Sequence, residues 1–398
     1  MENNCPAPIN RSLALLASLV YFVQGALGIS AVALPMFLRQ RGWTVSEIAT
    51  FSFVEGLPWT LKVIYGAISD GIPIGGLRRK PYVILASLVS AAGWIGLAVW
   101  GKGSGAIYFF GALASLGFAV TDVVTDAWIV ENSTNETSQI YQSLAWGFRS
   151  LGAVGGGVAG GWLAENFPHR LIFAGTTLLP VLTLLAGCLI REPRGRKEGN
   201  VLNPVSAVME SLKSIMGKDL RWFCLFLVVV NAPTSFGTPF FFHLKENLVF
   251  SESLLGGLSS LTWIGAVAGC FAYGRFFKDW PLQRALFLAV GLSAVNTLLT
   301  FGVVGRTSAF SLSVLGGFLG YVSLLPVMAS ASVLSRRPGI EGSLFALVMS
   351  VHNLSQILWT YVGGKLFDII GLTALIGGST FIVITGIFFV RRIQVLRG

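Results

Sequence analysis

The chain has 398 residues, of which 54% are hydrophobic and only 12% are charged, and its mean hydropathy is +0.72. The charged fraction is about half that of soluble globular domains, so the composition excludes a water-soluble fold and predicts an integral membrane protein. The net charge of +10 does not indicate nucleic-acid binding, because the basic residues lie in short segments between long apolar runs. The four cysteines show no metal-ligand spacing, and we expect neither a metal site nor a cofactor.

The apolar runs predict membrane-spanning helices. A helix needs roughly 20 residues to cross a hydrocarbon core of about 30 Å, whereas barrel strands alternate over about 10 residues. The run Val83–Trp100 is apolar throughout, so we predict an all-α membrane protein of about twelve transmembrane helices. The predicted spans are 14–38, 46–68, 81–100, 106–130, 139–164, 170–190, 220–243, 254–276, 283–304, 308–334, 342–368 and 371–391.

Basic residues between the spans set the orientation. With the N-terminus in the cytoplasm, 19 of the 28 Lys and Arg residues lie in cytoplasmic segments, 6 in outer segments and 3 within spans. Cytoplasmic loops of membrane proteins carry such an excess, so both termini are predicted to be cytoplasmic. The polar N-terminus shows no cleavable signal or transit segment, and we expect a bacterial or cyanobacterial plasma membrane.

The chain is predicted to consist of two six-helix halves, 1–190 and 220–398, joined by a polar linker at 191–219. A shift of 203 positions places Gly160 and Gly161 on Gly363 and Gly364, which indicates an internal duplication. Two parallel six-helix bundles with pseudo-two-fold symmetry resemble major-facilitator transporters. We therefore expect a secondary transporter that works by alternating access, as a monomer.

Ionisable residues within the spans are candidates for function, because a charge at a helix centre costs an estimated 2.5–3.5 kcal/mol on insertion scales. The same shift of 203 aligns Arg149 with His352, so both halves place a basic group near the membrane midplane. Arg149 is the better substrate anchor, since a guanidinium binds carboxylates bidentately. The residues assigned to substrate binding are Arg149, His352, Asn353, Trp59 and Lys62.

The acidic residues are assigned to proton coupling. Asp122 and Asp126 are four residues apart and share a helix face, and two neighbouring carboxylates disfavour double ionisation, which favours binding of one proton. The alternative is that both acids only neutralise Lys62 and hold spans two and four together. Glu55 is a third candidate, in a segment made irregular by Gly56 and Pro58.

Glycines in the fifth span predict close helix packing. Gly152, Gly156 and Gly160 recur at every fourth residue, and Gly157 and Gly161 form a second row. Small residues at this spacing let two backbones approach closely.

The loop after the second span carries a motif similar to the Gly-x-x-x-Asp…Gly-x-Arg-Lys loop of major-facilitator transporters. The matching residues are Gly66, Asp70, Arg78 and Arg79. The resemblance implies a gating latch for the outward-open state, in which the carboxylate caps a helix of the opposite half. It also implies that the arginines pair with an acid at the end of span four, which is the position of Glu131.

Three segments resemble the folate–biopterin transporter family of the major facilitator superfamily: 59–82, 122–131 and 339–353. The resemblance implies proton-linked symport of folates or pterins, with Lys62, Asp122, Asp126 and Arg149 as functional positions. A pterin with a dicarboxylate tail suits these charges and nearby stacking aromatics. The alternatives are a carrier of another organic anion, or an assembly protein for light-harvesting complexes from the same superfamily. An enzyme is disfavoured, because the three histidines do not cluster.

Overall fold

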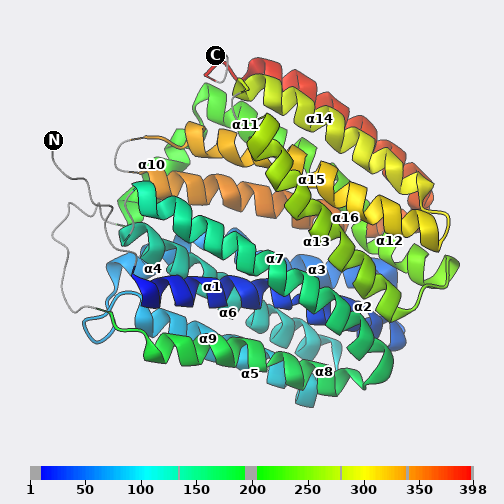
Figure 1. Ribbon diagram of the computed structural model, residues 1–398, viewed down its shortest axis with the longest axis horizontal. Helices are drawn as coiled ribbons and strands as arrows, with labels where there is room; N and C mark the ends of the chain where they lie inside the picture. The colour runs from blue at the N-terminus through cyan, green and yellow to red at the C-terminus, as the bar shows by residue number, and fades with distance from the viewer. Residues whose placement is uncertain (1–9, 133–134, 193–203, 278–279, 338–339, 396–398) are drawn as a thin grey trace.

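The computed structural model describes residues 10–132, 135–192, 204–277, 280–337 and 340–395, and these are almost entirely helical. The helices run side by side along the bundle, and the chain enters α1 and leaves α16 at the same end (Figure 1). The first half contains α1 (Arg11–Ala26), α2 (Gly28–Gln40), α3 (Val45–Thr60), α4 (Lys62–Gly71), α5 (Lys80–Trp100), α6 (Ser104–Glu131), α7 (Asn135–Asn166), α8 (His169–Thr176) and α9 (Leu178–Leu189).

The predicted second half follows α10 (Pro204–Ile215), which lies within the predicted linker. It contains α11 (Lys218–Val230), the short segments η1 (Ala232–Phe236), α12 (Gly237–Phe242) and η2 (His243–Asn247), then α13 (Glu252–Phe276), α14 (Leu282–Leu299), η3 (Thr300–Gly302), α15 (Arg306–Leu334) and α16 (Glu341–Arg392).

Each predicted span coincides with one of these helices or with a consecutive group of them. The last two predicted spans are both within α16, which is interrupted at Gly371 by a left-handed φ of 73°. Within the described residues, nine segments are long and apolar enough to cross a membrane, and the one over Ser343–Arg392 holds two spans. The spans within 45–71 and 135–166 are outside this group; the first contains Glu55 and Lys62, and the second is rich in glycine.

Several spans predicted as continuous are interrupted. The second span breaks at Leu61, where φ is −98° and ψ is 16°, three residues after Pro58 inside α3. A proline removes a backbone donor and clashes with the preceding turn. The seventh span passes through the 3₁₀ segment η1, which has a proline in its first turn. At Leu27 and Thr177, by contrast, the first and sixth spans keep right-handed helical torsion angles and continue as single membrane-length segments.

Helix α7 packs against helices of both halves through its two rows of glycines. A Cβ atom on Gly152 or Gly156 would overlap the backbone of α1, and a Cβ atom on Gly161 would overlap that of α13. The two rows predicted from the sequence therefore serve two different partners: α1 and α2 in the same half, and α13 in the other half. Backbones this close pack tightly with small residues at the contact.

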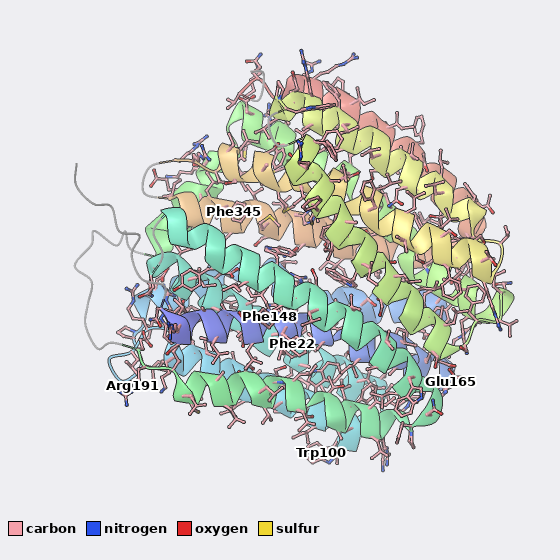
Figure 2. All side chains as sticks on the ribbon, viewed as in Figure 1. Phe22, Trp100, Phe148, Glu165, Arg191 and Phe345 are labelled. Atoms are coloured by element: carbon pink, nitrogen blue, oxygen red, sulfur yellow. The ribbon has the colours of Figure 1, made fainter. Side chains whose placement is uncertain are left out.

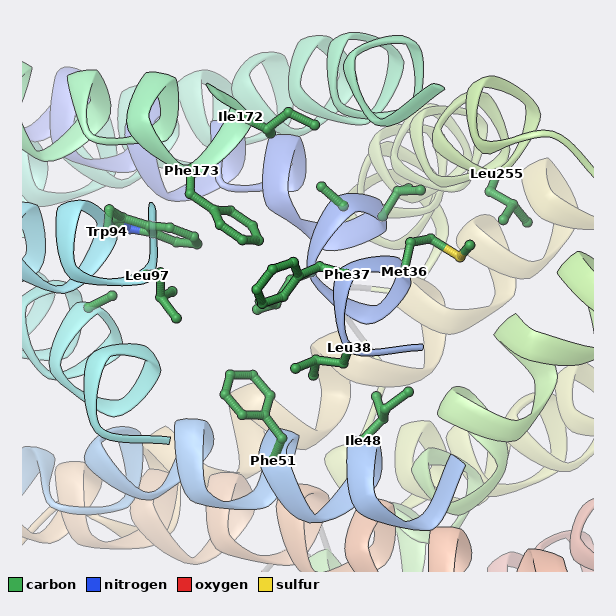
Figure 3. Packing of buried hydrophobic residues seen from close by; sticks show 14 of the residues in the cluster. Met36, Phe37, Leu38, Ile48, Phe51, Trp94, Leu97, Ile172, Phe173 and Leu255 are labelled. Carbon is green, nitrogen blue, oxygen red and sulfur yellow. The ribbon is translucent and has the colours of Figure 1, made fainter. Parts of the chain in front are cut away.

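Among the described residues, one buried apolar cluster includes side chains from both halves, and it lies at one end of the bundle. This cluster combines Phe37, Leu38 and Ile48 of the first half with Leu255 of the second (Figure 3), and it also includes Phe242. At the other end each half has its own cluster, around Leu13, Trp128 and Tyr141 in the first half and around Leu220, Leu334 and Leu344 in the second. Glu165 and Arg191 mark these two ends (Figure 2). We call the shared end, where Glu165 lies, the outer end, following the predicted orientation.

Candidate functional site

A buried ion pair joins the second and fourth spans. Lys62 Nζ lies 2.6 Å from Asp122 Oδ2, and Gln24 Nε2 of α1 donates to the other carboxylate oxygen at 2.5 Å. The side chain of Asp122 is only 6% exposed, while that of Lys62 is 20% exposed. The Lys62–Asp122 contact expected from the sequence is thus present, and Asp122 has a partner on each oxygen.

Asp126 lies one turn further along α6 and has a different environment. Its Oδ1 accepts a hydrogen bond of 2.6 Å from the hydroxyl of Tyr21 on α1. Asp122, Lys62 and Arg149 are its charged electrostatic neighbours. The hydrogen-bond partner of Asp126 is therefore neutral, and its charged neighbours are two cations and one anion.

Arg149 on α7 has aromatic neighbours from both halves. Its guanidinium carbon lies 5.0 Å from the ring centroid of Trp146 and 6.0 Å from that of Trp263 on α13. The charge acts on Asp122 and Asp126 and, across the seam, on Tyr321 of α15. Among the described residues it has neither an ion pair nor a hydrogen bond. Five donors without an acceptor in the described part of the chain suit the binding of an anion.

Trp59 lies at the break between α3 and α4. Its indole Nε1 donates to Ser115 Oγ at 3.0 Å, and its ring centroid is 5.0 Å from Lys62 Nζ. Its backbone carbonyl accepts a 3.0 Å hydrogen bond from Asn353 of α16. The structure therefore brings the predicted residues Trp59, Lys62 and Asn353 together, with Asn353 reaching across from the other half.

His352 does not join this group. Its side chain is buried in the second half, where Nδ1 lies 3.0 Å from Asn231 Nδ2 at the end of α11. Asn231 also donates to Ser355 Oγ at 2.7 Å. No described contact links His352 with Arg149, so its role in substrate binding stays a prediction.

Glu55 lines a cavity inside the first half. The cavity has a volume of about 320 Å³ and includes Ser52, Trp59, Trp94 and Ser115 in its walls. Among the residues that the structure describes, Glu55 forms no ion pair or hydrogen bond. Figure 3 labels further members of its lining, Leu38 from α2 and Ile48 and Phe51 from α3.

The motif residues of the loop after α4 form one cluster. The guanidinium of Arg79 binds Glu131 through Nε at 3.2 Å and Nη2 at 2.5 Å, and Nη2 also contacts Asp70. Burial lowers the pKa of Arg79, but Glu131 and Asp70 outweigh this effect and raise it above its ordinary value. Arg78 lies 3.5 Å from Asp70 and 3.7 Å from Glu131. The described partners of Asp70 are all within its own half.

Glycines shape the same loop. Gly75 and Gly76 have φ values of 61° and 78°, a region that residues with a Cβ rarely adopt. The turn they form pairs Ile74 with Leu77 and brings Arg78 and Arg79 back toward α4. Gly66 faces α6, where a Cβ would lie 3.6 Å from Val123.

Sequence reasoning missed several members of these sites. Tyr21 and Gln24 are uncharged and lie in an otherwise apolar span, three residues apart on one helix face, and that spacing is the only signal that could have identified them. Trp263 gave no local signal, because only the packing of α13 on α7 brings it to Arg149. Glu192 directly follows the basic end of span six and was included in the linker, yet it caps α5.

The chain shares the major-facilitator fold of two solved transporters. The chain superposes on the nucleoside transporter NupG with a TM-score of 0.76, covering 97% of this chain and 100% of that one at 13% identity. A D-xylose–proton symporter gives 0.70, with 96% and 97% covered at 13% identity. The predicted fold class is confirmed.

The chain belongs to the BT1 family, whose profile matches residues 24–376. It is 32% identical over 384 residues to a folate-biopterin transporter of Synechocystis sp., covering 92% of this chain and 76% of the relative. It is 27% identical to the probable folate-biopterin transporter 4 of Arabidopsis thaliana, with 90% and 89% covered. Folate transporter 2 of Plasmodium falciparum is 26% identical, with 81% and 72% covered. The family resemblance seen in the sequence is confirmed, and the relatives are transporters, not enzymes.

Proposed function

We propose that this protein is a proton-coupled symporter of folates or pterins. The observation that carries the proposal is the guanidinium of Arg149, which lies near the rings of Trp146 and Trp263 and has neither an ion pair nor a hydrogen bond among the described residues. A cation without a direct ion pair is costly within a membrane protein, and an anionic substrate would supply that pair. The names of the relatives, from bacterial, plant and protozoan sources, support folates and pterins as that substrate.

The chemistry around Arg149 suits a folate. Its forked donors match a carboxylate bidentately, and the indoles of Trp146 and Trp263 offer faces for aromatic rings. Trp146 is 43% exposed although it is large and apolar, which leaves its surface available for a ligand. Phe148 on the same helix is 40% exposed and is visible on α7 (Figure 2).

Asp126 is the acid to which we assign the proton. Asp122 is already compensated by Lys62 and Gln24, so it needs no proton to remain buried. Asp126 has only the Tyr21 hydroxyl as a hydrogen-bond donor among the described residues. A proton on Asp126 removes the repulsion between the two carboxylates, and its release would alter the field around Arg149.

Alternating access follows from rocking of the two halves, residues 1–190 and 220–398, about the α7–α13 seam. The shared apolar cluster and the Arg39–Glu246 pair fasten the outer end. The latch carboxylate Asp70 pairs with Arg79 of its own half. Both features support an inward-facing conformation. We also propose a monomer in a bacterial plasma membrane, with cytoplasmic termini.

Uptake into proteoliposomes tests the proposal. We expect labelled folate to accumulate when an inward proton gradient is imposed, and to stop accumulating when an ionophore collapses the gradient. Empty liposomes are the control. Equal uptake with and without the proton gradient would contradict proton coupling. If well-folded protein takes up neither folate nor biopterin, the proposal fails, which would favour another organic anion or an assembly role.

A further inference from the structure

The cavity beside Glu55 lies nearer the outer end of the bundle than the Lys62–Asp122 pair. Glu55 precedes Lys62 by seven residues in the second span, and Ser115 precedes Asp122 by seven in the fourth. At a rise of 1.5 Å per residue, both separations correspond to about 10 Å toward the outer end. The cavity is therefore about two helical turns beyond the charged pair.

Trp59 lies between the two places. It lines the cavity, and its ring is also 5.0 Å from Lys62 Nζ. Its indole N–H is already satisfied by Ser115, so the ring is held in a fixed orientation.

Glu55 is the only ionisable residue among those lining the cavity, and within the described residues it has no partner. The indole Nε1 of Trp94, in the same wall, is buried and has no acceptor among the described atoms. The walls also supply the rings of Phe51 and Phe118. A carboxylate acceptor, an unused donor and aromatic walls suit a flat heterocycle that carries adjacent N–H donors and a carbonyl.

The second half has a cavity of about 290 Å³ without this chemistry. Its lining includes Asn296, Ser293 and Thr297 but no ionisable residue. Of these two cavities, only the one in the first half has an acid among the described residues of its lining. In the same half, Asp122 and Asp126 are both engaged by other side chains.

We propose that the Glu55 cavity binds the pterin ring, with the 2-amino and N3–H donors on the Glu55 carboxylate, while Arg149 binds the glutamate carboxylates at the other end of a folate. This inference rests on the proposed function and assigns an orientation to the substrate. Because two parallel hydrogen bonds to one carboxylate are geometrically demanding, the cavity should discriminate by the 2-position of the ring.

Calorimetric binding to purified protein in detergent tests the orientation. The ligands are pterin, lumazine (which has an oxo group in place of the 2-amino group) and p-aminobenzoylglutamate, which lacks the pterin. We expect Glu55→Gln to weaken pterin binding by about tenfold or more and to leave p-aminobenzoylglutamate unchanged. Arg149→Gln should give the opposite pattern. Glu210→Gln, an exposed acid on α10, is the matched control.

The outcomes separate the two proposals. Unchanged pterin affinity in Glu55→Gln, with folate uptake intact in the wild type, overturns the orientation alone. A wild type that binds neither folate nor pterin overturns the proposed function as well. Should Glu55→Gln fail to fold, the wild type still decides, since we expect it to prefer pterin over lumazine by about tenfold. Equal affinities for the two rings would refute the inference.

Discussion

Glu192 caps the helix that begins at Lys80, since its Oε2 accepts the backbone N–H of Lys80 at 2.7 Å. Its Oε1 accepts the N–H groups of Arg78 and Arg79 at 2.8 and 3.0 Å. In return, Lys80 Nζ donates to the carbonyls of Cys188 and Ile190 at the end of α9, at 2.7 and 3.0 Å. An acid thus lies at a helix N-terminus and a cation at a helix C-terminus.

Loss of this cap should destabilise the loop that carries the gate. We expect Glu192→Gln to lower the free energy of unfolding by about 1–2 kcal/mol, because the helix N-terminus loses a charged acceptor. The measurement is the Tm in detergent, with Glu210→Gln as the exposed control. An unchanged Tm would contradict the capping role.

Replacement of Arg149 by lysine should impair folate uptake. Lysine keeps the charge but loses the planar fork, so we expect Arg149→Lys to raise the KM for folate about tenfold and Arg149→Gln to abolish uptake. Arg306, exposed at the start of α15, supplies the control variant Arg306→Gln. Folate uptake by Arg149→Gln at the wild-type rate and equal surface expression would refute the anchor role.

Asp122 and Asp126 should differ in proton coupling. We expect Asp126→Asn to lose gradient-driven accumulation while retaining folate exchange across the membrane, since its partner Tyr21 is neutral. Asp122→Asn should instead lower the Tm, because it leaves Lys62 without its counter-ion. Counterflow and gradient-driven uptake, measured on the same vesicles, distinguish the two. Gradient-driven accumulation of folate by Asp126→Asn would show that a group other than Asp126 carries the coupling proton.

Two rows of glycine on one helix supply a sharp packing test. A Cβ atom on Gly161 would overlap the backbone of α13, whereas one on Gly155 meets nothing within 4 Å. We expect Gly161→Ala to reduce uptake several-fold by wedging the seam apart, and Gly155→Ala to be neutral or stabilising by up to about 1 kcal/mol. Similar uptake and Tm for the two variants would show that the seam does not limit transport.

Apolar length and charge placement were enough to predict the spans and the candidate charges from sequence, because membrane insertion depends on those two quantities. The rotation of each helix was not predictable. The shift of 203 places Arg149 on His352, but it is the next residue, Asn353, that forms a hydrogen bond with the other half. One residue turns a helix by about 100°, so a duplication fixes depth far better than the direction of a side chain.

Arg39 and Glu246 should hold the outer end closed. Arg39 Nε and Glu246 Oε1 are 2.6 Å apart, and the two side chains are 36% and 42% exposed. Pairs this exposed contribute about 0.2–1 kcal/mol, so Glu246→Gln should shift the population toward outward-facing states by about five-fold at most. The measurement is labelling of Leu255→Cys, buried in the shared cluster, by an impermeant maleimide in a chain lacking its native cysteines. Labelling should be faster in Glu246→Gln than in the parent chain. The charge-swapped double variant, Arg39→Glu with Glu246→Arg, should restore the slow labelling rate. If the swap labels as fast as Glu246→Gln, the pair does not act as a clamp and the apolar cluster alone closes this end.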